Sequence, residues 1–203
     1  MDSPLSNWCA PLSGKGANLA GLGISQCAPL SGTHSNRKAE LGWFPFNLVT
    51  SPQDFTSAAW LKSSMTALAD ELRPTAANGY AISSNFAAII GQPLTVSFEY
   101  FPTGLDNITI WIGGFSANRS GVQLNIAAGT IADYVLGTGV APTHKSVTNM
   151  GAGWRRVVFT ALAQQTPSET TAFRNLSPSV NANGINGIRI RRLQVGSGSG
   201  QWI

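Results

Sequence analysis

The stretch Asn47–Trp60, NLVTSPQDFTSAAW, marks the point where this chain becomes a folded domain. It opens with an apolar run, breaks at Ser51-Pro52, and ends with two large rings, Phe55 and Trp60, separated by small and polar residues. An apolar run followed by a Ser-Pro break indicates a first strand and a turn. We expect the two rings to fold back over the edge of a sheet, because large aromatic side chains bury much apolar surface.

Alternating apolar and polar residues follow this stretch in one segment after another. The segments are Leu94–Phe101, Asn107–Gly113, Val122–Ile126, Thr130–Val135, Trp154–Ala161 and Ile185–Val195. In the first of them, Phe98 and Tyr100 belong to one face and Glu99 to the other. Alternation with a period of two, interrupted by Gly, Pro and Asn turns, is typical of antiparallel sandwiches. We therefore predict an all-β, antiparallel, jelly-roll-like β-sandwich, with a short helix near Thr66–Leu72 as its only helix.

The composition favours such a turn-rich sandwich and argues against a nucleic-acid partner. Hydrophobic residues make up 43% of the 203 residues and charged residues 11%, against about 25% charged in a typical soluble domain. The net charge is +4, but the 13 basic residues are scattered apart from Arg155-Arg156 and the group Arg189, Arg191 and Arg192. No basic run carries interleaved aromatic residues, so we expect these arginines to bond neighbouring carbonyls or a protein partner.

The sequence shows neither a membrane span nor a secretory signal. No apolar run approaches the roughly 18 residues that a membrane-spanning helix needs. The start, MDSPLSNWCAPLSG, lacks the basic and apolar regions of a signal peptide. We expect synthesis in a host cytoplasm and no membrane partner, with assembly into a virus particle as one route out of the cell.

Residues 1–46 have a different character from the rest of the chain. The hexamer CAPLSG occurs at Cys9–Gly14 and again at Cys27–Gly32, with a glycine-rich segment between the copies. Proline and glycine disfavour a helix here, and the apolar content is too small for a separate core. We predict an extended N-terminal arm that becomes ordered on a partner. The predicted docking residues are Cys9, Pro11, Leu12, Cys27, Pro29 and Leu30.

Cys9 and Cys27 are the only two cysteines, and they occupy the same position in the two repeats. Three states remain open for them: free thiols, a disulfide within the chain, and a crosslink between subunits. Synthesis in a cytoplasm favours free thiols at first, with oxidation outside the cell as a later step. The cysteine spacing matches no zinc-binding pattern, and His34 is the only histidine nearby. We therefore expect no metal and no cofactor.

Two parts of the sequence together resemble a family of bacteriophage domains. The opening pattern of that family is matched by Asn47, Leu48, Phe55 and Trp60. Its later Gly-x-Gly-Trp-x-Arg strand is similar to Gly151–Phe159, GAGWRRVVF. The family consists of carbohydrate-binding-module-like β-sandwiches in tail-fibre and other virion proteins. The resemblance implies the same fold, and a place in a virion, for this chain.

The resemblance covers residues 47–195 and so divides the chain into three parts. The arm, residues 1–46, precedes the sandwich, and residues 196–203, GSGSGQWI, form a predicted flexible tail. The last family strand is similar to Ile188–Val195, IRIRRLQV, but this chain has arginines where the family shows small or aromatic residues. That departure argues against a simple transfer of a sugar site.

The sequence does not predict a catalytic site. The chain has only nine acidic residues, and Asp70-Glu71 is the one adjacent pair. Adjacent side chains on a strand point to opposite faces, so this pair lacks the arrangement of glycosidase carboxylates. No nucleophile motif and no phosphate-binding glycine loop are present. We therefore predict a protein that is not an enzyme.

Sugar binding requires exposed aromatic faces and polar side chains that bond hydroxyl groups. Trp111 lies opposite to the isoleucines of its segment, and Tyr134 belongs to another predicted strand. These two residues are the candidate sugar platform. Packing in the core or against another subunit is the alternative role for both.

Two classes of function remain. In the first, the chain is a non-enzymatic structural protein of a bacteriophage virion, and its arm docks on capsid, neck or tail proteins. The sandwich is then displayed as a head decoration, collar or short fibre, in a homo-oligomer for which a trimer is our guess. In the second, it is a receptor-recognition module that binds host surface glycans. The resemblance implies the first and allows the second.

Overall fold

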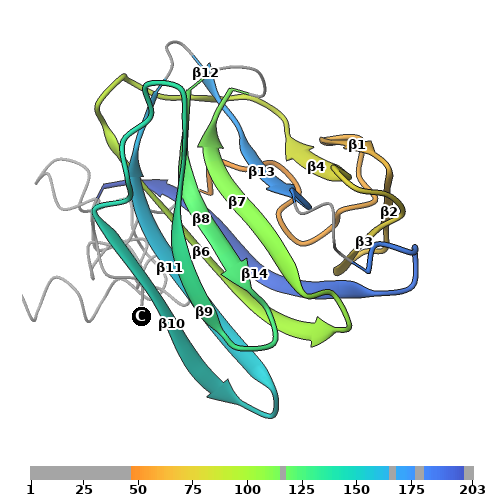
Figure 1. The fold of residues 1–203 in the computed structure, drawn as a ribbon. Helices are drawn as coiled ribbons and strands as arrows, with labels where there is room; N and C mark the ends of the chain where they lie inside the picture. The colour runs from red at the N-terminus through yellow and green to blue at the C-terminus, as the bar shows by residue number, and fades with distance from the viewer. Residues whose placement is uncertain (1–46, 115–117, 165–167, 177–180, 199–203) are drawn as a thin grey trace, which may run out of the picture. The chain divides into compact units, whose positions relative to one another are not determined.

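The structure, a computed structural model of the chain, describes residues 47–114, 118–164, 168–176 and 181–198 (Figure 1). Contacts divide the chain into Met1–Phe46 and Asn47–Ile203, and the description below concerns the second unit. The predicted arm lies outside the described residues, and so do its six docking residues, Cys9, Pro11, Leu12, Cys27, Pro29 and Leu30.

Two six-stranded sheets make up most of the described chain. Sheet A contains β1 (Trp60–Ser63), β4 (Tyr80–Ser83), β13 (Thr171–Arg174), β7 (Asn107–Gly113), β8 (Arg119–Asn125) and β9 (Thr130–Leu136), in that order. Sheet B contains β10 (His144–Gly151), β11 (Trp154–Leu162), β6 (Pro93–Thr103), β14 (Gly187–Ser197), β3 (Glu71–Pro74) and β2 (Met65–Ala67). A small third sheet pairs β12 (Ser168–Glu169) with β5 (Phe86–Ala87).

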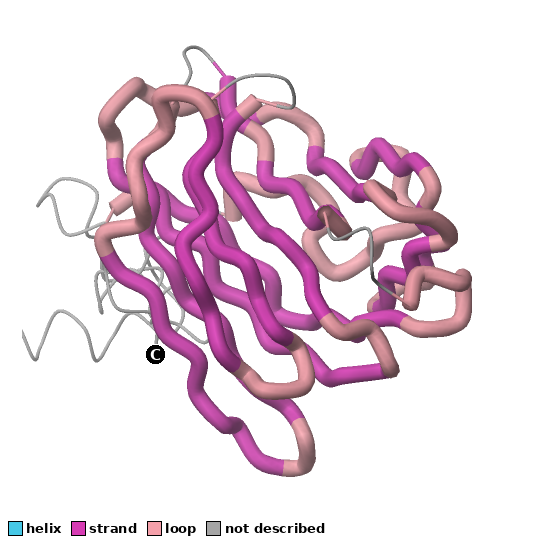
Figure 2. Tube along the Cα trace, in the orientation of Figure 1, coloured by secondary structure: helices cyan, strands magenta, loops and turns pink. Residues whose placement is uncertain are grey.

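The predicted antiparallel, jelly-roll-like sandwich is confirmed. Every strand pair in the two large sheets is antiparallel, and the described residues contain strands and loops without a helix (Figure 2). One continuous hydrophobic core lies between the sheets. In β6, the predicted inward residues Phe98 and Tyr100 are fully buried in this core. The outward residue Glu99 is buried too, because arginine side chains cover it on the other face of sheet B.

The predicted helix near Thr66–Leu72 is wrong. This segment forms β2 and β3, which pair with each other in antiparallel register from Met65 opposite Pro74 to Ala67 opposite Leu72. β3 also pairs with β14, and Leu72 is buried in the core. Pairing with β14 satisfies backbone groups that an isolated short helix would leave partly unpaired, so tertiary context overrides the local propensity.

The opening stretch lies at the edge of sheet A, where Trp60 begins the edge strand β1, and the Phe55 and Trp60 rings are buried in the core. Phe55 and Trp60 pack with their ring centroids 4.8 Å apart, and both contact Phe173 of β13. The indole nitrogen of Trp60 donates to the Ser51 carbonyl oxygen at 3.0 Å, so this large ring is buried with its polar atom paired. The two rings of this stretch therefore pack between the sheets and contribute to the hydrophobic core.

Asn47 and Leu48 attach the start of the domain to β14, although they are not part of a regular strand. The Leu48 amide donates to the Val195 carbonyl at 2.9 Å, and the Asn47 side chain both accepts from the Val195 amide and donates to the Leu193 carbonyl. β14 itself continues to Ser197, two residues into the predicted tail. Both ends of the described domain therefore lie beside the last residues of β14.

No helix long and apolar enough to cross a membrane occurs in the part of the chain that the structure describes.

Candidate functional site

The outer face of sheet A, which points away from the core, carries the two residues of the predicted sugar platform. In β7 the side chains of Ile110 and Ile112 enter the core, and alternation places Trp111 on the opposite face, as predicted. Strand pairing then sets Gly121 of β8 opposite Trp111, and Tyr134 of β9 opposite Gly121. The β7–β8–β9 pairing therefore brings Trp111 and Tyr134 together, with ring centroids 5.9 Å apart.

Trp111 itself is completely buried on this face. The guanidinium of Arg119 lies 4.6 Å from the centre of its ring, and Tyr134 packs against it. Arg119 donates to the Tyr134 hydroxyl at 3.3 Å and to the Gly114 carbonyl at 3.1 Å, which fixes the arginine over the indole. A buried ring cannot stack on a ligand directly. Trp111 is therefore a support for Tyr134, whose side chain is only partly buried.

The indole nitrogen of Trp111 has no hydrogen-bond partner in the described structure, although it is buried. Leaving a buried donor unpaired costs about 1–3 kcal/mol. Burial of Trp111 on this face therefore carries a cost in stability.

Gly121 allows the backbone of β7 to approach β8 closely at Ile110 and Trp111. A Cβ atom at this position would overlap the Ile110 carbonyl oxygen and lie 2.5 Å from the Trp111 Cα. We expect Gly121→Ala to lower the free energy of unfolding by about 2 kcal/mol, because backbone atoms on the neighbouring strand must shift. Chemical denaturation of the purified variant measures this loss. A change below about 0.5 kcal/mol would show that the strands are not packed this closely.

A hollow of about 240 Å³ lies on the same face, beside Tyr134 along β8 and β9. Its lining consists of Asn107, Gln123, Asn125, Thr130, Ile131 and Ala132. Gln123 and Asn125 are exposed on β8, where they alternate with the buried Val122 and Leu124. Sequence reasoning missed these amides. Their alternation was visible in the sequence, but their position next to Tyr134 depends on the order of the strands.

Tyr134 and the amides of the neighbouring hollow together suit the binding of a sugar. A partly exposed tyrosine ring offers an apolar face to the C–H groups of a sugar, and its hydroxyl group bonds to polar atoms. Carboxamides offer both donors and acceptors to sugar hydroxyl groups. Ligand sites in proteins commonly combine aromatic surface with a few placed polar groups in a hollow. The outer face of sheet A contains all three elements.

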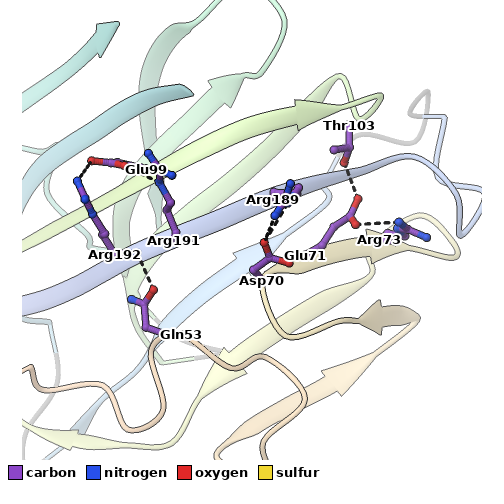
Figure 3. Close-up of polar contacts among 9 residues, drawn as sticks. All are labelled: Gln53, Asp70, Glu71, Arg73, Glu99, Thr103, Arg189, Arg191 and Arg192. Carbon is purple, nitrogen blue, oxygen red and sulfur yellow. Dashed lines mark hydrogen bonds and ion pairs between the residues drawn. The ribbon is translucent and has the colours of Figure 1, made fainter. Parts of the chain in front are cut away.

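The adjacent acidic residues Asp70 and Glu71 are both engaged in ion pairs (Figure 3). Asp70 accepts two hydrogen bonds from Arg189, at 2.5 and 2.9 Å. Burial raises the pKa of Glu71, but hydrogen bonds from Arg73 and Thr103 outweigh burial and hold it below its usual value. Among the described residues, no group of three or more His, Cys, Asp or Glu side chains could hold a metal ion.

Comparison with known proteins adds weak likenesses only. No protein-family profile matches the sequence, and no curated protein is similar to it. Among solved structures, TmCBM61 in complex with β-1,4-galactotriose has a TM-score of 0.42 at 9% identity, over 75% of this chain and 99% of that one. A family 29 carbohydrate-binding module has a TM-score of 0.40 at 10% identity, over 75% and 83% of the two chains.

A domain of tailspike protein 4 from bacteriophage CBA120 gives a TM-score of 0.42 at 11% identity, over 75% of this chain and 22% of that one. Scores at this level carry no argument about the site. The assignment of the fold rests on the strand pairing described above.

Proposed function

We propose that residues 47–198 form a non-catalytic carbohydrate-binding module that binds a glycan on the outer face of sheet A. The observation that carries this proposal is the position of Tyr134. Its ring packs against Trp111, and its hydroxyl group accepts a hydrogen bond from Arg119. It lies beside the hollow lined by Asn107 and Gln123. The ring is held in place before any ligand arrives, so little conformational entropy is lost on binding.

Each part of the face has a role in this proposal. The Tyr134 ring stacks on one sugar unit, and the amides of Gln123 and Asn107 bond the hydroxyl groups of the next. Trp111 fixes the tilt of the tyrosine ring, with 41° between the two ring planes. No charged side chain of either sign is among the residues that line the hollow, so the hollow suits a neutral sugar.

Tyr134→Ala is expected to weaken glycan binding at least about tenfold, because an aromatic side chain buried by a ligand contributes on the order of 1.5–3 kcal/mol. A glycan array with the full chain identifies the ligand, and isothermal titration of the tightest neutral oligosaccharide then compares the variants. Gln123→Ala is expected to weaken binding by a smaller factor, through the loss of about one hydrogen bond.

Leu61→Ala is the matched control, since Leu61 is exposed on the same sheet in the edge strand β1, three strands from β7. Its affinity should equal that of the unmodified protein. If the array shows no bound glycan, or if Tyr134→Ala binds as tightly as the control, the proposal fails.

We propose a bacteriophage virion as the setting of this module. Residues 1–46 would anchor the chain to capsid, neck or tail proteins, and the sandwich would be displayed as a decoration, collar or short fibre in a homo-oligomer. The repeated CAPLSG hexamer supports this setting, because two equivalent segments suit two equivalent docking sites.

Removal of residues 1–46 tests the anchoring role. The shortened chain should no longer associate with phage particles, while its glycan affinity stays unchanged. Mass spectrometry of purified particles, with and without reductant, would also reveal the state of Cys9 and Cys27. Absence of the full chain from particles would rule out the virion setting and leave the glycan-binding proposal intact.

A further inference from the structure

The outer face of sheet B, on the opposite side of the sandwich, carries a local excess of positive charge. The Glu99 side chain is 1% exposed and lies beneath three arginines. Its oxygens accept from Arg156 at 2.8 Å, Arg191 at 2.7 Å and Arg192 at 3.0 Å. Figure 3 shows Arg191 and Arg192 of β14 on either side of this carboxylate. One carboxylate among three guanidinium groups leaves two positive charges in excess.

A β-bulge places two consecutive arginines on the same face. In a regular strand Arg192 would point toward the core, but the register shifts between Arg191 and Gln194. Arg192 has a φ of 54°, a left-handed backbone conformation that residues other than glycine rarely adopt. Leu193 returns to the core and is fully buried. Bulges of this kind often re-aim side chains at functional sites, and the strain is tolerated where the surrounding structure holds it.

The arginines are held in place and yet remain accessible. The guanidinium of Arg191 lies 3.7 Å from the centre of the Trp154 ring, which in turn packs against Phe101 at 5.7 Å. The Arg192 amide donates to the Gln53 side chain at 2.8 Å (Figure 3). The Arg191 and Arg192 side chains are 41% and 66% exposed. Each of these two guanidinium groups has five N–H donors and gives Glu99 one hydrogen bond, so Glu99 engages only a minority of the donors.

We propose that Arg156, Arg191 and Arg192, organised by Glu99, form an anion-binding site for carboxylate or sulfate groups of an acidic polysaccharide. Guanidinium groups pair with such oxyanions through two parallel hydrogen bonds, and a prearranged set of them loses little entropy on binding. That the anion is carried on a sugar rests on the proposed glycan-binding function. The charge excess and the geometry stand independently of it.

The charge distribution favours a discrete anionic group over a nucleic-acid backbone. On the same face, Arg189 is paired with Asp70 and Arg73 with Glu71, so the neighbouring arginines carry no local excess. A nucleic acid is bound through a stripe of several cationic side chains along its phosphates. Here the excess is confined to one cluster, which suits one or two oxyanions at a time.

The test measures binding of the full chain to polygalacturonate, dextran sulfate, neutral dextran and a single-stranded DNA oligonucleotide. The variant is Arg191→Gln together with Arg192→Gln, which leaves Arg156 on Glu99. Arg189→Gln on the same face removes one positive charge outside the cluster and is the control. We expect the double variant to lose at least about tenfold in affinity for an acidic polysaccharide and the control to stay within about twofold.

Carboxylate and sulfate carriers are distinguished by which of the two acidic polymers the unmodified chain prefers. Weak binding to both polymers, equal binding by the double variant, or tighter binding to the DNA oligonucleotide would each overturn the proposal. Tyr134→Ala separates the two sites: it should lose the neutral glycan and still bind the acidic polymer through the arginines. Loss of neutral-glycan binding alone would therefore identify a failure of the site on sheet A, and loss of acidic-polymer binding alone a failure of the arginine site.

Discussion

Phe173→Ala is expected to lower the free energy of unfolding by about 4 kcal/mol, the largest effect in this molecule. Phe173 is fully buried on β13 of sheet A. Its ring lies 5.4 Å from that of Phe98 in sheet B, 5.9 Å from Phe55 and 6.1 Å from Trp60. It therefore joins both sheets to the opening stretch. Truncation would remove the edge-to-face contacts with Phe98 and Phe55 and leave a cavity that rigid strands cannot fill.

Equilibrium denaturation of the variant and of Phe173→Leu measures this contribution. The leucine variant keeps most of the volume and should cost less than about 1.5 kcal/mol. If both variants show the same small loss in the free energy of unfolding, the rings of Phe173, Phe98, Phe55 and Trp60 do not form the centre of the core. The comparison therefore tests the packing of the opening stretch against the sandwich.

Glu99→Gln is expected to lower the free energy of unfolding by about 3 kcal/mol at neutral pH. The substitution removes a buried carboxylate that accepts hydrogen bonds from three arginines and leaves their charges close together without a counter-charge. Breaking such a pair from one side is costly because the remaining groups stay partly desolvated. The exposed guanidinium of Arg192 can turn into solvent, which limits the loss.

The effect of Glu99→Gln should depend on pH in a defined direction. Burial raises the pKa of Glu99, but hydrogen bonds from Arg156, Arg191 and Arg192 outweigh burial and hold the pKa below its ordinary value of 4.5. A carboxyl group whose pKa is lower in the folded state stabilises the fold above its unfolded pKa and loses this contribution as the pH falls through the folded value. The difference between the two proteins should therefore shrink in acid.

Denaturation curves at neutral and acidic pH check this prediction. Asp133→Asn is the control, since Asp133 and Lys145 form a half-exposed pair that should contribute no more than about 0.5 kcal/mol. Equal stability of Glu99→Gln and the unmodified protein at neutral pH would contradict the proposed role of the carboxylate.

Local alternation predicted most of the fold and the right face for several site residues. In β14, Ile188 and Ile190 are buried and Arg189 is exposed, as the sequence indicated. Alternation also placed Trp111 on the outer face of its strand. It could not show what covers that face, because Arg119 and Tyr134 come from strands that only the tertiary pairing brings alongside.

Features that depend on long-range contacts were outside the reach of the sequence. The sequence identified Phe55 and Trp60 as decisive and placed them at a sheet edge, where β1 lies. It could not identify their partner Phe173, which lies more than a hundred residues further along the chain. The bulge at Arg191–Gln194 contains no glycine that would have indicated it in the sequence. The Glu99 cluster likewise joins three strands, so neither its charge excess nor its geometry could be inferred from the scattered arginines.

The most direct test of the account is to titrate the full, isotopically labelled chain with the tightest neutral oligosaccharide from the array and follow its amide and indole resonances. We predict that the largest shifts fall on the outer face of sheet A, at the Trp111 indole, the Tyr134 amide and the Gln123 side chain. The Trp154 indole, on the outer face of sheet B, should not move. Shifts confined to sheet B or to the exposed loop at Ile89 and Ile90, with no change at Trp111 and Tyr134, would contradict the proposed binding face.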